Sequence, residues 1–321
     1  QDHFCGLSNS VRWTPLENDN QPVVAFSWPA AIFAVLWLAG TTLLWYQGRK
    51  SGFSQSWMAA PTFVVGSALF MAVLVKSTGM AWKDLSKETV LVLGCSLLFF
   101  ALVWLFGRRS SYPFDLTDVS TRMKAIYTFF YFAATCFIGR MVLPYLLARF
   151  VLHRPMSDYG YRFKGTFRNA WVYAVSLGLA VPMVWWASTQ PSFVQKYPLV
   201  KTAIESNTLS IELFVVYHLA YGLVFVSGES FWRGFILFGT GRQLGKNALF
   251  LMLIPYVAAH FGKPVVETLG AILAGLFLGY LAWEHRSFWL GVALHWGVAL
   301  MMDLFALYRR GVTMVWAGSG G

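Results

Sequence analysis

The stretch "FVSGESFWRGFILFG", residues 225 to 239, places a carboxylate and a guanidinium four residues apart in an otherwise apolar run. On a helix, Glu229 and Arg233 lie about 40° apart, so their side chains are close enough to pair. A charge at the centre of a membrane helix costs roughly 2.5 to 3.5 kcal/mol on insertion scales, so it usually faces a partner or a water-filled cavity. Two interpretations follow: a salt bridge that only stabilises the helix, or part of a functional site.

The composition around this stretch is that of a membrane protein. Of the 321 residues, 57% are hydrophobic and 12% are charged, and the mean hydropathy is +0.55. Because so little charged surface is available, we expect an all-α, polytopic integral membrane protein. The 15 Trp residues suit belts at the membrane interfaces. The net charge of +11 is spread over short loops. This distribution favours the lipid bilayer, with its anionic headgroups, as the partner of the protein. It does not favour nucleic acid, which would need a contiguous basic surface.

Nine apolar stretches meet or approach the roughly 20 residues that a spanning helix needs. We therefore predict about eight to nine transmembrane helices, with the sixth stretch long enough to bend, dip or break around Gly228. "EHRS" joins the last two stretches in a tight antiparallel hairpin. Lys and Arg are shared almost evenly between the two sets of loops, so they indicate no orientation. The stretches are 23–46, 57–75, 89–106, 125–150, 170–188, 209–238, 244–261, 268–284 and 287–307.

Two histidines lie in later apolar runs: His260 in "LIPYVAAHFGKP" and His295 in "LGVALHWGVALMMD". A lone buried histidine is more often a satisfied polar residue than a catalyst. If the three helices pack together, however, Glu229, Arg233, His260 and His295 converge on one polar cavity. A carboxylate or a neutral imidazole there can take a proton from water, while a second imidazole stabilises an oxyanion. Peptide-bond hydrolysis is the reaction that this assembly suggests.

Two other chemistries are weaker. Glu229, His260 and His295 could bind Zn²⁺ and leave one position open, but the HExxH spacing is absent, so the sequence requires no cofactor. Ser227 and Ser230 flank Glu229, but no GxSxG motif surrounds them. Cys5, Cys95 and Cys136 are well separated and indicate neither a metal cluster nor a disulfide framework.

Other polar and small residues suit structural roles. His218 lies 11 residues before Glu229, about 16 Å along a helix, which is too far for the same proton transfer. Asp303, eight residues after His295, is expected to pair with a neighbour or to lie near the interface. Ala271, Gly275 and Gly279 recur every four residues, so another helix can approach closely.

With these residues in place, the segment from about 158 to 305 resembles the CPBP family of membrane proteins, which includes the CAAX prenyl endopeptidases and the bacterial abortive-infection-type proteins. The family pattern is EExxxR followed by Gly, then FxxxH, then HxxxN or HxxxD, each on its own membrane helix. "GESFWRG" is similar to the first motif, "YVAAH" to the second and "HWGVA" to the third. "YGYRF" near 159–163 resembles the segment that often precedes the family core.

The resemblance implies roles and shows departures. Glu229 and Arg233 match the second Glu and the Arg of the first motif, and His260 and His295 match the histidines of the other two. Gly228 stands where the family has its first Glu, the residue thought to activate water. Ala299 replaces the Asn or Asp of the third motif, and Tyr256 replaces the Phe of the second.

Together these observations divide the chain and give two functional hypotheses. We expect a polar segment at 1–22, transmembrane helices of unassigned family at 23–150, a CAAX-protease-like helical core at 151–310 and a tail at 311–321. The polar start indicates either a trimmed beginning or a removed signal.

The first hypothesis is an intramembrane endopeptidase of the bacterial inner membrane that cleaves membrane-bound peptides, such as prenylated ones, near the C-terminus. The alternative is a pseudoenzyme that serves as a scaffold or assembly subunit and contacts partner subunits or a pigment-like cofactor.

Overall fold

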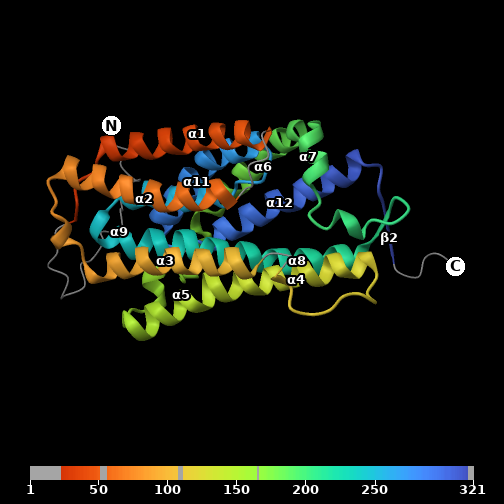
Figure 1. The fold of residues 1–321 in the computed structure, drawn as a ribbon, viewed down its shortest axis with the longest axis horizontal. Coiled ribbons are helices and arrows are strands. Elements are labelled where there is room, and N and C mark those ends of the chain that lie inside the picture. Colours follow the sequence, from red (N-terminus) through yellow and green to blue (C-terminus); the bar gives the residue numbers. More distant parts are fainter. Residues whose placement is uncertain (1–22, 51–55, 108–110, 165, 317–321) are drawn as a thin grey trace, which may run out of the picture.

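The computed structural model describes residues 23–50, 56–107, 111–164 and 166–316, and its helices run mostly along the long axis of the molecule (Figure 1). The predicted polar segment 1–22, Cys5 and the last five residues of the predicted tail lie outside the described residues. Eight of the described helices are long and apolar enough to cross a membrane. The prediction of an all-α polytopic membrane protein is confirmed.

The elements follow one another with short connections. The spanning segment Thr121–Val151 comprises α4, α5 and the π-helical segments beside them, and Ile211–Leu244 comprises α8, η8 and α9. Two three-residue strands, β1 and β2, pair in parallel near the C-terminal end. The helices and strands are α1 (Trp28–Lys50), α2 (Ser56–Thr78), α3 (Lys87–Phe106), α4 (Thr121–Phe137), η3 (Ile138–Val142), α5 (Leu143–Leu146), η4 (Leu147–Val151), α6 (Ala170–Ala187), α7 (Pro191–Lys196), β1 (Thr208–Ser210), α8 (Ile211–Glu229), η8 (Ser230–Phe238), α9 (Gly239–Leu244), α10 (Asn247–Ala258), α11 (Val265–His285), α12 (Trp289–Arg309) and β2 (Thr313–Val315).

One predicted span has a different form. The stretch 244–261 contains α10, which has only 12 residues, because the chain turns at Gly245 with φ of +58° and leaves the helix again after Ala258. A helix of that length is about 18 Å long and cannot cross a hydrocarbon core of about 30 Å. The preceding span does not break at Gly228. It continues as a π-helix from Ser230 and then as α9.

Local sequence signals fix several helix ends. Ser86, Ser120 and Ser210 each precede a helix, and their hydroxyls accept a hydrogen bond from a first-turn amide of α3, α4 and α8. Between α11 and α12 the chain reverses at Arg286, whose φ is +54°. The predicted tight hairpin at "EHRS" is therefore confirmed.

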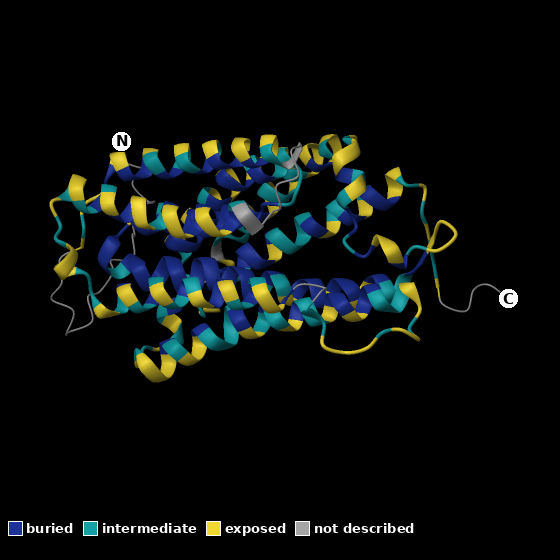
Figure 2. Cartoon of the chain, in the orientation of Figure 1, coloured by how far each residue is buried: buried dark blue, intermediate teal, exposed yellow. Residues whose placement is uncertain are grey.

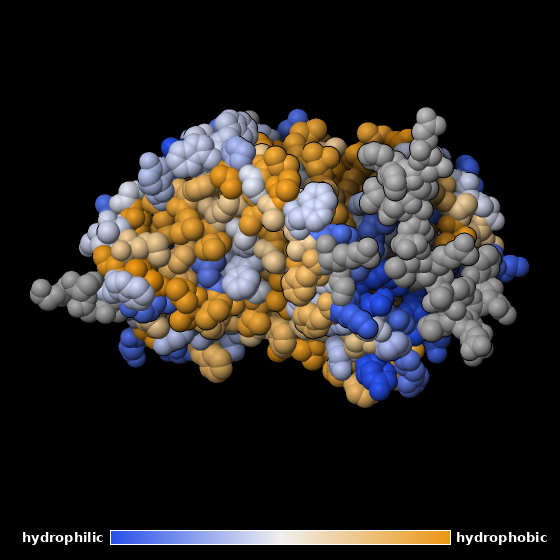
Figure 3. All heavy atoms as spheres, turned by 180° about the vertical axis from the view of Figure 1, so that it is seen from behind, coloured by the Kyte–Doolittle hydropathy of each residue, from blue (hydrophilic) through white to orange (hydrophobic). Residues whose placement is uncertain are grey.

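The centre of the molecule lies along η8 and α9, whose residues are almost all buried, whereas the outer helices expose a long face (Figure 2). The exposed residues are apolar: on α6, for example, Trp171, Leu179 and Met183 are each at least 65% exposed. The rear face is likewise covered mostly by apolar side chains, with hydrophilic ones gathered towards one end (Figure 3). A continuous apolar exterior of this kind contacts lipid.

A charged cluster links α3 to the carboxy-terminal half of the chain. Glu88 accepts hydrogen bonds from Arg154, at 3.0 Å, and from the hydroxyl of Tyr159, at 2.8 Å. Arg242 of α9 pairs with Asp158 and lies 3.5 Å from the Glu88 carboxylate. This cluster therefore joins the start of α3 to α9 and to the segment that follows η4, and its two acidic and two basic side chains balance in charge.

Candidate functional site

The Glu229–Arg233 pair lies at the junction of α8 and η8. Nη1 of Arg233 donates to Oε1 of Glu229 at 2.8 Å, and the two residues are 0% and 1% exposed. The Arg233 guanidinium also lies over the ring of Tyr256, 4.2 Å from its centroid. A fully buried guanidinium therefore has a carboxylate and an aromatic face as partners.

The backbone at this point has an unusual form. From Ser230 to Phe238 the helix is π-helical for nine residues, and it begins directly after Glu229. Most π-helices are single-turn bulges, and they occur often at functional sites. The sequence does not predict this π-helix, because "SFWRGFILF" is equally consistent with an ordinary apolar α-helix.

His295 of α12 completes a three-residue arrangement on one carboxylate oxygen. Its Nδ1 lies 2.9 Å from Oε1 of Glu229, the oxygen that also accepts from Arg233. Because the carboxylate accepts, Nδ1 carries the proton, and Nε2 is left to accept or donate according to the charge of the ring. The contact with Glu229 orients the His295 ring, and the side chain is 23% exposed.

The carboxylate approaches α12 closely because residue 291 is a glycine. A Cβ on Gly291 would lie 3.1 Å from Oε2 of Glu229. That oxygen is buried and has no hydrogen-bond partner among the described residues. Glu229 is thus held by its two Oε1 contacts and by close packing against α12. Gly291 is a site residue that the motif comparison missed.

His260 follows α10 and faces the same region. Its Nδ1 lies 2.8 Å from the backbone oxygen of Tyr256, which can only accept, so Nε2 is the acceptor of the neutral ring. The rings of His260 and His295 are nearly parallel, at 10°, with centroids 6.4 Å apart. The structure therefore brings all four predicted residues, Glu229, Arg233, His260 and His295, into one neighbourhood.

The segment after α10 is tied down from two sides. The Thr268 hydroxyl donates to the backbone oxygen of His260 at 3.1 Å, and Nζ of Lys196 donates to the Gly262 oxygen at 3.0 Å. The Tyr197 hydroxyl donates to both oxygens of Glu267 at 2.8 Å. Burial, with the Glu267 carboxylate beside it, raises the pKa of Tyr197, so this tether keeps its proton at any physiological pH.

The small residues of α11 act as predicted, and α10 is the helix that they admit. A Cβ on Gly275 would lie 2.5 Å from Leu253 and 2.7 Å from the Tyr256 ring, and one on Gly279 would lie 2.9 Å from Met252. Close contact of α10 with α11 places Tyr256, and the His260 bonded to it, against Arg233 and His295.

Gly228 and Ala299, two of the three departures from the family pattern, are both buried. A Cβ on Gly228 would meet only Trp232 within 4 Å, at 3.7 Å from Nε1, which is ordinary contact. A Cβ at position 228 is thus accommodated without a clash. Ala299 is 6% exposed and packs in the apolar cluster around Phe225 and Val292.

His218 and Asp303 do not join the site. Nε2 of His218 lies 3.3 Å from Oδ2 of Asp303, without the alignment of a hydrogen bond, and the Tyr217 hydroxyl donates to the same oxygen at 2.8 Å. These three residues form a second buried cluster between α8 and α12. The expectation that Asp303 pairs with a neighbour agrees with this geometry.

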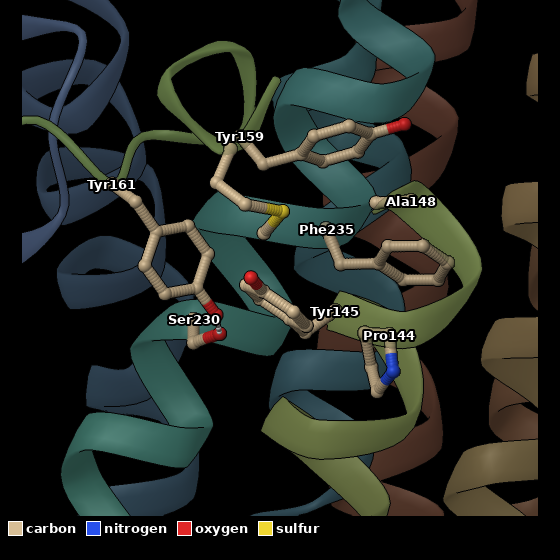
Figure 4. Close-up of a pocket in the computed structure, with 8 residues that line it drawn as sticks. Pro144, Tyr145, Ala148, Tyr159, Tyr161, Ser230 and Phe235 are labelled. Carbon is tan, nitrogen blue, oxygen red and sulfur yellow. Dashed lines mark hydrogen bonds between the residues drawn. The ribbon is translucent and has the colours of Figure 1, made fainter. Parts of the chain in front are cut away.

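The serines beside Glu229 have other partners. The Ser227 hydroxyl donates to the Val224 oxygen at 3.0 Å, and the hydroxyls of Ser230 and Tyr161 share a hydrogen bond. Ser230 and Tyr161 border a small pocket between η8 and the segment that contains Pro144 and Tyr145 (Figure 4). Tyr161, from "YGYRF", therefore holds that loop against η8, next to the site.

No metal site accompanies this arrangement in the part of the chain that the structure describes. There, no group of three or more His, Cys, Asp or Glu side chains is arranged to hold a metal ion. Cys95 and Cys136 are free thiols. The zinc alternative with Glu229, His260 and His295 gains no support from this geometry and stays a prediction.

The geometry agrees with a comparison to protein families. Residues 207–301 match the family model described as type II CAAX prenyl endopeptidase Rce1-like. This segment belongs to the CPBP family. The matched part of the CPBP core contains Glu229, Arg233, His260 and His295, whereas the predicted limits at 151 and 310 stay predictions. No curated protein and no solved structure matches the chain.

Proposed function

We propose that this membrane protein is an intramembrane endopeptidase of the CAAX-protease type in which His260 accepts the proton from water. The observation that carries the proposal is the shared Glu229 oxygen, which holds Arg233 at 2.8 Å and His295 at 2.9 Å. Such an arrangement fixes the tautomer and the orientation of an imidazole, as the carboxylate of a catalytic triad does.

The chemical step divides between the two imidazoles. Nε2 of His260 accepts a proton from water, and the resulting hydroxide adds to the carbonyl carbon of a peptide bond. The displaced electron pair moves onto the carbonyl oxygen, and His295, protonated at both nitrogens, donates Nε2–H to that oxyanion. The proton on His260 then passes to the leaving amine as the C–N bond breaks.

Each remaining residue has a positioning role. Glu229 compensates one positive charge and orients His295, while Arg233 holds Glu229 and stacks on Tyr256. By resemblance to its family, the substrate is a membrane-bound peptide that is cleaved near its carboxyl terminus. The bacterial inner membrane is the location that this resemblance favours.

The experiment is cleavage of a farnesylated peptide by purified protein in proteoliposomes, followed by mass spectrometry. His260→Ala is expected to lower the rate by about 10²- to 10⁴-fold, the usual contribution of a general base. His153→Gln, a change at an exposed histidine, is the matched control and is expected to keep the wild-type rate. Full activity of the His260→Ala variant would contradict the assignment.

A second candidate, a catalytically silent scaffold or assembly subunit, is favoured by Gly228 and Ala299. For this candidate, the wild type is inactive, the Gly228→Glu/Ala299→Asn variant gains cleavage, and purification from the native membrane yields bound partner subunits. Wild-type cleavage that depends on His260 would exclude it.

A further inference from the structure

A second arginine lies within a membrane-spanning segment and is partly buried, outside the site described above. Arg140 is part of η3, inside the spanning segment Thr121–Val151, and lies 11 residues before its end. That separation is about 16 Å along a helix, so the residue is far from the Val151 end of the span. A guanidinium keeps its charge inside proteins and therefore needs an anionic or aromatic partner there.

The described residues give Arg140 an aromatic partner only. Its guanidinium carbon lies 5.6 Å from the centroid of the Trp232 ring. Its Nε is buried without a hydrogen-bond acceptor, and no carboxylate in the described chain lies within 4 Å of it. The buried Arg233, in contrast, has a carboxylate partner at 2.8 Å. The donors of Arg140 are therefore unused in the described part of the molecule.

The same indole borders the space beside Gly228. A Cβ at this glycine would meet Trp232 alone within 4 Å, with Nε1 at 3.7 Å and Cδ1 at 3.9 Å. The described residues supply no acceptor for that indole N–H. Gly222, two turns earlier, shows the contrast, because Trp296 fills its space at 2.9 Å. Trp232 thus lies beside both the Arg140 guanidinium and the position next to Gly228, and its indole N–H is a further donor.

We propose that Arg140 and the Trp232 indole N–H bind one carboxylate of a membrane-borne ligand in the space that Gly228 leaves. A carboxylate matches the planar fork of a guanidinium and is small enough to lie beside a glycine. Its depth makes the ligand a carboxylate at the end of an apolar chain. The carboxyl terminus of a lipid-anchored peptide and a free fatty acid share this chemistry. The inference does not rest on peptide hydrolysis.

The first test measures thermal unfolding in a neutral detergent with three probes: N-dodecanoylglycine, dodecanoate and the neutral N-dodecanoylglycinamide. The acyl glycine is expected to raise Tm by about 2 °C or more at saturation, and the amide is expected to have no effect. Arg140→Gln is expected to abolish the shift, whereas Arg149→Gln, at an exposed arginine on the same span, is expected to keep it.

The outcomes separate the possible sources. A shift with the acyl glycine alone identifies a peptide carboxyl terminus, and an equal shift with dodecanoate identifies a fatty acid; both support the site. Equal shifts with the acid and the amide would overturn the proposal, as would no shift with either acid or a shift that survives Arg140→Gln. Loss of peptide cleavage with the shift intact would contradict only the proposed function.

A second test places the carboxylate on the chain itself. Gly228→Glu is expected to raise Tm by about 2 °C relative to Gly228→Gln, which adds the same bulk and helix propensity without the charge. In an Arg140→Gln background, that difference is expected to disappear, and Gly228→Glu is also expected to block the shift with the acyl glycine. Equal Tm values for Gly228→Glu and Gly228→Gln in the wild-type background would contradict the assignment.

Discussion

The α8 and α12 helices carry two polar clusters that use the same chemistry in different surroundings. In one, Glu229 of α8 contacts His295 of α12 at 2.9 Å. In the other cluster the imidazole lies on α8 and the carboxylate on α12: Nε2 of His218 lies 3.3 Å from Oδ2 of Asp303. Each cluster joins a carboxylate to an imidazole across the same helix pair, but the first also contains Arg233.

The two clusters differ in access. Asp303 is 0% exposed, and the His218 ring is packed against Phe214 and Tyr217, with centroids 4.4 and 4.8 Å away. The His295 side chain, in contrast, is 23% exposed. A carboxylate–imidazole pair inside a membrane bundle is therefore no evidence of a reactive site by itself. What distinguishes the Glu229 cluster is a second imidazole, His260, and the partial exposure of His295.

The largest predicted effect is the loss of Glu229. Glu229→Ala leaves the guanidinium of Arg233 buried and unpaired, which is expected to lower the free energy of unfolding by about 3–5 kcal/mol. Urea or SDS unfolding in mixed micelles measures it. The Glu229→Leu/Arg233→Leu variant removes both charges and is expected to recover most of that stability while it stays inactive. A double variant as unstable as the single one would contradict a paired role.

A smaller effect is expected in the buried cluster of Tyr217, His218 and Asp303. Tyr217→Phe removes the hydrogen bond to Asp303, which is expected to cost about 1.5–3 kcal/mol of unfolding free energy, because the acceptor is a buried carboxylate. Measured per folded protein, the cleavage rate is expected to stay within about twofold of wild type, since catalytic effects of a general base are far larger. A large rate loss without a loss of stability would show that the two clusters act together.

The smallest effect is expected at the close contact of α10 with α11, which positions His260. Gly275→Ala forces α10 away from α11 and is expected to cost about 1–3 kcal/mol of unfolding free energy by overpacking. The displacement also moves Tyr256 and His260, so cleavage is expected to fall while the His218 cluster is unaffected. Gly270→Ala is the control: a Cβ there meets nothing within 4 Å, and Ala has the better helix propensity. Equal destabilisation by the two changes would contradict the close contact.

The sequence predicted the spans well, because hydrophobic length alone decides them. It failed at 244–261, where apolar composition continues through a turn at Gly245 and past the end of α10. The contact between Glu88 and Arg154 was also beyond sequence reasoning, since 66 residues separate them and neither lies in a motif. Local patterns carry no information about which distant loops meet.

The sequence predicted which residues group at the site, because their motifs follow one another along three apolar stretches. The contacts that each residue makes could be read only from the structure. Spacing predicted the Glu229–Arg233 pair, and it could not show that His295 shares the same oxygen. Nor could it show that Gly291 admits the carboxylate. An i, i+4 pair is a local property, whereas a tautomer depends on what packs against the ring.

Hydrolysis in water enriched in ¹⁸O tests the proposed function most directly. Purified wild-type protein in proteoliposomes is expected to cleave a farnesylated peptide and to incorporate one ¹⁸O atom into the new carboxyl terminus. The His260→Ala variant, folded to the same extent, is expected to give no such product above background. If wild-type protein yields no labelled product, or His260→Ala yields as much as wild type, the Glu229–His295–His260 cluster is not the peptidase centre proposed for it.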